Sequence, residues 1–186
     1  MSLQLVISIA VVLFVVGWFA AGTHINVRKG EQAMVWLQQG LPLLGEKTTL
    51  RWLGSSVVEL KIPNAKPPFR DAEVLVVLEP RDVAPLWWVA RLRGRRDLLV
   101  VRGALQRVPK SELDAADPRV WTLGRAAQTT LSTSSVASSF EGLQPVRICV
   151  RRNPPYLELQ WRLEHARSHP SHEVVELARG LANADL

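Results

Sequence analysis

The side chains most suited to metal chemistry are three histidines near the C-terminus, His165, His169 and His172. Imidazoles four residues apart on a helix can bind one metal ion together. Pro170 works against this arrangement, because the residue before a proline is pushed away from helical geometry. We therefore expect a polar loop that joins the last strand to the last helix, rather than a metal site. Metal-dependent enzyme chemistry around these histidines stays the weakest of three functional hypotheses.

Two other features could suggest chemistry but do not match a functional motif. The run GLPLLGEKT over residues 40–48 resembles a phosphate-binding loop, but Glu46 separates the glycine from the lysine that the motif needs side by side. Cys149 lies inside an expected strand, where a half-buried thiol is far more common than a nucleophile. With no catalytic motif found, the sequence predicts a protein that is not an enzyme and that needs no cofactor.

A helix expected over residues 83–93 combines two tryptophans with a group of arginines. Sequence neighbours on a helix point about 100° apart, so one indole can face the core while the other faces elsewhere. Asp82 is a candidate N-cap and Gly94 a stop. The favoured interpretation is a crossover helix packed on a sheet, but docking to a membrane or to a partner protein stays open. The candidate contact residues are Trp87, Trp88, Arg91, Arg93, Arg95 and Arg96, with Arg28 and Lys29 nearer the N-terminus.

The elements that must position these residues begin with an apolar segment. The first 27 residues carry no formally charged side chain. Residues 3–22 supply the roughly 20 apolar residues that cross a bilayer about 30 Å thick. A cleaved signal peptide is less favoured, because the run is long and no basic residue precedes it. We therefore expect a single-pass anchor over residues 1–22 and a connector over residues 23–47, with a two-turn helix over residues 31–39.

Charge predicts the orientation of this anchor. Arg28 and Lys29 follow the apolar run at once, and cytoplasmic flanks of membrane spans carry the excess of Lys and Arg. From residue 23 to residue 110 there are 15 Lys or Arg and 8 Asp or Glu, so this half holds the whole positive excess. We expect the N-terminus outside and the domain in the cytoplasm of a cell membrane. Anionic lipid is the simpler partner for this charge, and no specific nucleic acid is expected.

Residues 48–186 are expected to form one α+β domain with a mixed sheet, in the order β-β-β-α-β, loop, β-β-α. Residues 49–53 and 56–62 predict a hairpin around Gly54-Ser55, and residues 146–152 and 156–163 predict a second one. The apolar run of residues 73–79 predicts a central strand, and with the helix over 83–93 and a strand over 97–102 it has the length of a βαβ unit. Ser171 is expected to cap the last helix, and residues 129–142, rich in Ser and Thr, to form a mobile loop.

An anchor, a compact domain and no catalytic group together predict the function. Our first hypothesis is an accessory or assembly module of a membrane complex that binds a partner protein. The first alternative is a domain that binds anionic lipid through its basic, membrane-proximal half. The second alternative is the metal-dependent enzyme described above.

Overall fold

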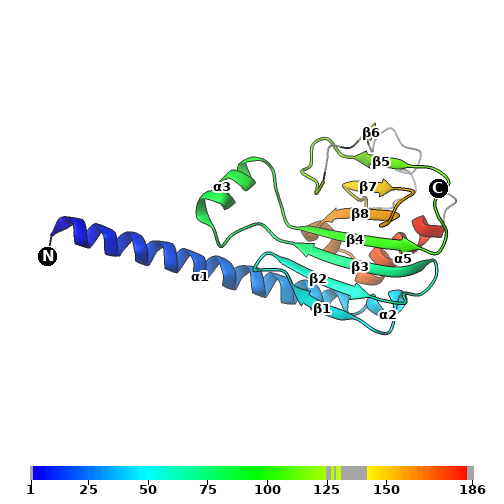
Figure 1. The fold of residues 1–186 in the computed structure, drawn as a ribbon, viewed down its shortest axis with the longest axis horizontal. Helices are drawn as coiled ribbons and strands as arrows, with labels where there is room; N and C mark the ends of the chain where they lie inside the picture. Colours follow the sequence, from blue (N-terminus) through cyan, green and yellow to red (C-terminus); the bar gives the residue numbers. More distant parts are fainter. Residues whose placement is uncertain (1, 125–126, 128, 131–141, 184–186) are drawn as a thin grey trace.

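The structure is a computed structural model that describes residues 2–124, 127, 129–130 and 142–183. It is an α+β fold in which a long N-terminal helix joins an eight-stranded sheet (Figure 1). The helices are α1 (Leu3–Leu37), α2 (Leu41–Leu44), α3 (Ala84–Leu92), α4 (Leu163–Arg167) and α5 (Ser171–Asn183). The strands are β1 (Thr49–Trp52), β2 (Val57–Ile62), β3 (Phe69–Val77), β4 (Leu98–Leu105), β5 (Leu113–Ala116), β6 (Thr129–Thr130), β7 (Arg147–Val150) and β8 (Leu157–Arg162).

The sheet has the strand order β1-β2-β3-β4-β8-β7-β5-β6, and among the described strands only the β5–β6 pair is parallel. Both predicted hairpins, β1–β2 and β7–β8, are present. Gly54 adopts a φ of 73° in the first turn, a conformation that glycine reaches without a steric penalty. Residues 74–80 are all buried, as expected of a central strand. Residues 131–141 of the predicted Ser/Thr-rich loop lie outside the described residues.

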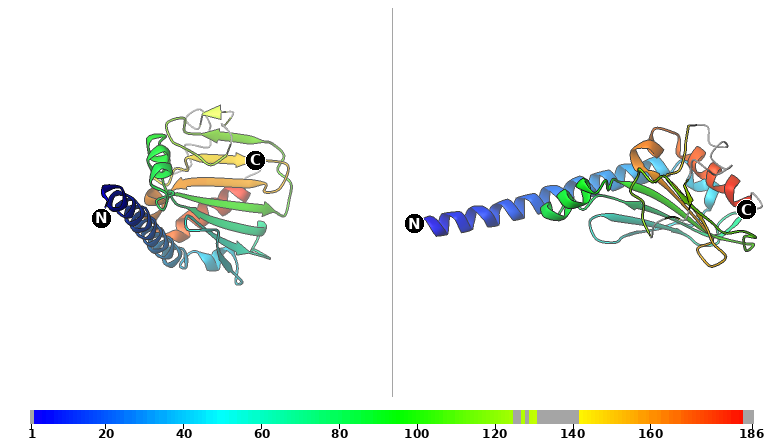
Figure 2. Two further views of the ribbon diagram at one scale, coloured as in Figure 1. Left: turned by 60° about the vertical axis from the view of Figure 1, so that its left-hand side comes forward. Right: turned by 90° about the horizontal axis from the view of Figure 1, so that it is seen from above.

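The predicted βαβ unit is wrong, because β3 and β4 pair antiparallel, with Val77 opposite Leu98. An antiparallel neighbour needs no crossover, so α3 is free to leave the sheet. It extends beyond the sheet end and lies beside α1 (Figures 1 and 2). The interpretation of α3 as a crossover helix packed on the sheet is therefore wrong as well.

One face of the sheet carries the main apolar core. Alternate strand residues point to this face and meet α4, α5 and the second half of α1, which cover it (Figure 2). The core includes Phe69, Leu159 and Trp161, none of which is exposed to solvent. The indole N–H of Trp161 donates to the carbonyl of Leu143 over 3.1 Å, so this large side chain is buried without an unsatisfied donor.

Helix α1 is one unbroken helix of 35 residues. The expected anchor and the expected two-turn connector helix are therefore parts of one continuous helix. The first proline in the chain is Pro42, so nothing between Gly22 and Leu37 removes a backbone donor from the helix. Ala33 and Leu37 of α1 and Leu44 of α2 belong to the core, so residues 23–47 fold with the sheet.

The first half of α1 differs from the second half in exposure. It is apolar and almost entirely exposed, with Leu13 and Phe14 more than three-fifths accessible. Within the described residues, α1 is the one helix long and apolar enough to cross a membrane. The core helix of a soluble domain would instead be mostly buried.

Candidate functional site

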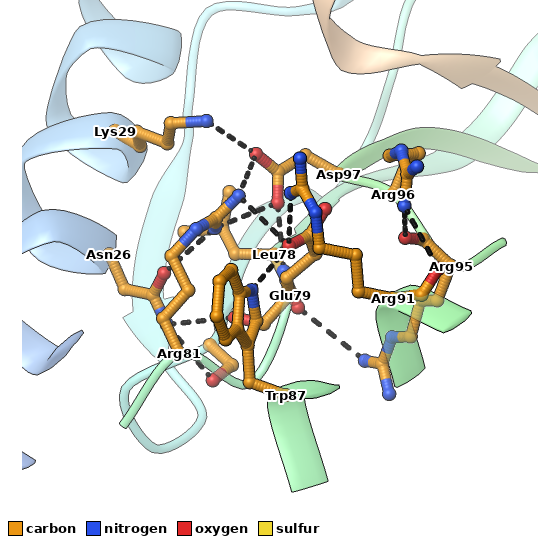
Figure 3. Close-up of polar contacts among 11 residues, drawn as sticks. Asn26, Lys29, Leu78, Glu79, Arg81, Trp87, Arg91, Arg95, Arg96 and Asp97 are labelled. Atoms are coloured by element: carbon orange, nitrogen blue, oxygen red, sulfur yellow. Dashed lines mark hydrogen bonds and ion pairs between the residues drawn. The ribbon is translucent and has the colours of Figure 1, made fainter. Parts of the chain in front are cut away.

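The candidate site is the junction where the exposed half of α1 meets the domain. Three parts of the chain converge there: α1 between Trp18 and Gly30, the segment 78–83 that follows β3, and Asp97 just before β4. Figure 3 shows the polar contacts among Asn26, Arg81 and Asp97 at the centre of this junction. These parts are far apart in sequence. We call the residues Asn26, Lys29, Glu79, Arg81 and Asp97 the junction network.

Small residues let the backbone of α1 approach the domain closely. The buried positions Gly22, Asn26, Gly30, Ala33 and Leu37 follow each other at helical spacing and form one stripe. A Cβ on Gly22 would collide with the carbonyl group of Arg81, and a Cβ on Gly30 would collide with the ring of Trp52. The obstructing atoms at Gly22 are backbone atoms, so the contact requires glycine there, whereas at Gly30 they are side-chain atoms and the Trp52 ring would have to shift.

Arg81 is the centre of the junction network. Its guanidinium group binds Asp97 in bidentate fashion, with both N···O distances at 3.0 Å. It also donates to the side-chain carbonyl of Asn26 on α1 over 3.0 Å, and it lies 3.5 Å from Glu79. The amide nitrogen of Asn26 donates in turn to the backbone carbonyl of Glu79 over 3.0 Å (Figure 3). These bonds fix the rotation of α1 against the loop that follows β3.

Asp97 is buried but remains ionised. Burial by itself would raise the pKa of Asp97, but hydrogen bonds from Arg81, Lys29 and the backbone N–H of Glu79 lower this pKa below its ordinary value. The ammonium group of Lys29 lies 2.8 Å from the Asp97 carboxylate, which adds a second link from α1 to the domain. The Glu79 carboxylate has partners on α3: the indole N–H of Trp87 donates to it over 2.7 Å, and the guanidinium group of Arg91 lies 3.4 Å away.

The lowered pKa of Asp97 predicts a loss of stability in acid. A carboxyl group with a lowered pKa in the folded state stabilises the fold above its unfolded pKa of about 3.9, and this contribution is lost as the pH falls through the folded pKa. We expect the native chain in detergent micelles to lose more free energy of unfolding than Asp97→Asn does when the pH falls below about 4. Equal slopes for the two proteins on this acid side would contradict the assignment.

A row of aromatic rings connects α1 with α3. Phe14 and Trp18 lie one turn apart on α1 with ring centroids at 5.9 Å, and Trp18 lies 5.9 Å from Trp87 of α3. The indole N–H of Trp18 also donates to the backbone carbonyl of Arg81 over 2.9 Å. Of the two adjacent tryptophans, Trp87 faces inward and Trp88 is 56% exposed. The prediction that Asp82 caps α3 is wrong, because the N-cap position is Val83, and the Asp82 carboxylate accepts a hydrogen bond from Ser55.

The arginines after Trp88 divide into two groups. Arg95 stacks on Trp121 at 5.1 Å, and Arg96 donates to backbone carbonyls of Arg91 and Arg95, so both are turned toward the protein. Arg91 lies over the Trp87 ring at 5.5 Å and is half exposed. Arg93 and Arg28 are exposed, and neither makes an ion pair within the part of the chain that the structure describes.

The three histidines do not come together as a metal site. His165 and His169 lie close, with ring centroids at 5.4 Å, and His169 contacts Ser168 and the carbonyl of His165. His172 is exposed on α5. Among the described residues no group of three or more metal-ligand side chains gathers. The connection to α5 contains the short helix α4, and not only the expected polar loop. The prediction that Ser171 caps α5 is wrong, because its buried hydroxyl makes no hydrogen bond with the part of the chain that the structure describes.

Other ionisable groups lie on the second face of the sheet. Glu59 and Glu73 share a hydrogen bond. Accepting this hydrogen bond lowers the pKa of Glu59. The pKa of Glu73 is raised, mainly because the carboxyl group is partly buried and also because it donates the hydrogen bond to Glu59. The guanidinium group of Arg102 lies 3.8 Å from the Glu73 carboxylate, beside a groove of about 510 Å³.

Cys149 is buried on the same face of the sheet. Burial and the nearby Asp114 carboxylate raise the pKa of its thiol, which makes the thiol a poor nucleophile.

The chain matches no family model, no curated protein and no solved structure. The two carboxylates of the junction network, Glu79 and Asp97, are buried and paired with cations of the same network, which suits a rigid connection rather than the binding of a polar ligand. Sequence reasoning did not find Asn26, Glu79, Arg81 or Asp97; the available signal was that Glu79 and Asp97 end and begin two apolar strands.

Proposed function

We propose that this protein is a single-pass membrane protein whose α+β domain acts on the cytoplasmic face as a protein-binding module of a membrane complex. The observation that carries the proposal is the rigid junction. An apolar helix long enough to span a bilayer continues without a break into the domain, and the junction network holds it at one rotation. A flexible tether would keep a domain near the membrane, but it would not fix which surface the domain presents.

The dimensions of α1 agree with this proposal. From Leu3 to Gly22 the helix advances about 30 Å at 1.5 Å per residue, the thickness of a hydrocarbon core. Gly22 is the first residue of α1 that the domain buries. The domain therefore begins where the span ends. Its partner-binding surface would stand at a constant height and angle, and tethering would raise its effective concentration toward any partner in the same membrane.

Basic residues support the cytoplasmic side. Arg28 and Lys29 lie just past the span, and the residues up to position 110 hold the whole positive excess of the chain. Positive residues close to a span remain in the cytoplasm. Lys29 pairs with Asp97, so Arg28 is the exposed cation of the two.

The proposal is tested with the full chain in native membranes. A C-terminal tag should be accessible to protease only in inside-out vesicles. Mild detergent extraction followed by chemical cross-linking should yield the tagged protein in a complex of defined stoichiometry. A tag on the external side would overturn the orientation, and a protein recovered only as an uncross-linked monomer would overturn the role as an interaction module.

A further inference from the structure

We propose that α3 is a second membrane contact, whose exposed apolar face lies in the interfacial layer of an anionic bilayer beside the point where α1 leaves it. This inference rests on the proposed membrane span of α1. It adds to that span a segment of the folded domain that reaches back into the lipid. The domain would then be held by two contacts, one crossing the bilayer and one lying at its surface.

The exposed face of α3 is apolar along its whole length. Leu86, Trp88 and Val89 are 51%, 56% and 44% exposed, and Leu92 is 81% exposed. At 100° per residue these four positions fall on one half of the helix circumference, and Trp87, Ala90 and Arg91 fall on the other half. Water is a poor solvent for such a face, and monomeric soluble proteins rarely expose a continuous apolar surface of this kind.

The place where α3 meets α1 fixes the depth of this face. Trp87 contacts Trp18, and the segment before α3 contacts Trp18 and Gly22 through the carbonyl of Arg81. Trp18 stands about 22 Å along the helix from Leu3, near the far end of a core about 30 Å thick. Figures 1 and 2 show α3 beside α1, beyond the end of the sheet from which α1 extends. The apolar face is therefore level with the boundary between acyl chains and headgroups.

The charges around α3 favour lipid with anionic headgroups. Arg93 follows the helix and is exposed, Arg91 is half exposed, and Arg28 is exposed on α1. Of the nearby carboxylates, Glu79 and Asp97 are buried and form ion pairs. Asp82, just before α3, is half-buried and accepts a hydrogen bond from the hydroxyl of Ser55, so the exposed charges beside the apolar face are mainly the arginines. Tryptophan and leucine on one face with arginine beside them are the pattern of an interfacial helix. A soluble protein partner fits less well, because ring contacts run from Trp88 on this face through Trp87 to Trp18 in the apolar half of α1.

Depth-dependent fluorescence quenching in the full chain tests the inference. In a Cys149→Ala background, single cysteines are introduced as Leu92→Cys on α3, Phe14→Cys within the proposed span and Val108→Cys beyond the far end of β4, where the side chain is 58% exposed. Each carries the same polarity-sensitive fluorophore, and the protein is reconstituted into phosphatidylcholine vesicles with added phosphatidylglycerol. Spin-labelled lipids quench from the headgroup or from the middle of the acyl chain.

The three positions separate failure of this inference from failure of the proposed function. We expect quenching by the headgroup label at position 92 and no quenching at position 108. Position 14 lies about 16 Å along the span from Leu3, close to the middle of the bilayer, so its fluorophore should be quenched mainly by the acyl-chain label. Position 92 should respond about 5–10 Å below the surface, the usual depth of an interfacial helix. Quenching at position 14 without quenching at position 92 would overturn the membrane contact of α3 and leave the span of α1 intact. An unquenched position 14 would overturn the span itself.

Discussion

Replacing Arg81 with methionine should lower the free energy of unfolding of the domain by about 3–5 kcal/mol, the cost of leaving a buried charge without its partner. The substitution removes both hydrogen bonds to Asp97 and the contacts with Asn26 and Glu79. Asp97 is only 5% exposed and Glu79 only 1%, so water cannot replace the lost guanidinium group. Lys29 still pairs with Asp97, which keeps the expected cost from exceeding this range.

The matched control is Arg70→Met, which removes an arginine from an ion pair of the same 3.0 Å length. Arg70 and Asp71 are 64% and 49% exposed, and surface pairs contribute about 0–1 kcal/mol. Both variants and the native chain are unfolded with urea in detergent micelles and followed by tryptophan fluorescence. Similar losses for Arg81→Met and Arg70→Met would show that the junction network does not stabilise the fold.

The features that follow from local patterns could be predicted from the sequence. The apolar half of α1 is recognised by composition alone, and both hairpins by alternation around short turns. The strand residues Leu157, Leu159 and Trp161 alternate with polar neighbours, and all three are buried. The α+β class follows from the same elements. Each of these signals lies within a few consecutive residues, where the side-chain period of a helix or a strand is directly visible.

The junction could not be predicted, because its contacts join residues far apart in the chain. Arg81 meets Asn26 across 55 positions, and Lys29 meets Asp97 across 68. Glu79 and Asp97 read as charged boundaries of apolar runs, and their roles appear only once β3 and β4 lie antiparallel. The placement of α3 also depends on the antiparallel pairing of β3 and β4. The length of the segment from β3 to β4 suits a βαβ unit equally well, and no local signal distinguishes a crossover helix from a helix in the connection between two antiparallel strands.

The second large effect is expected from Gly22→Val, because the neighbour of Gly22 cannot move aside. A Cβ at this position would collide with backbone atoms of Arg81 and Asp82, not with the flexible end of a side chain. To relieve the collision α1 must shift away from the loop that follows β3. That shift weakens the hydrogen bonds from Trp18 and Asn26 to this loop. We expect a loss of about 2–4 kcal/mol in the free energy of unfolding, from overpacking and broken hydrogen bonds together.

Gly17→Val on the same helix separates this effect from the general cost of valine in a helix. A Cβ on Gly17 has no neighbour within 4 Å, so this variant should keep native stability to within about 0.5 kcal/mol. In native membranes the two variants should also differ in function: Gly17→Val keeps its cross-linked partner, whereas Gly22→Val stays in the membrane and loses it. Retention of the partner by Gly22→Val would mean that tethering alone suffices. The rigid junction would then stabilise the domain without setting the direction in which it faces.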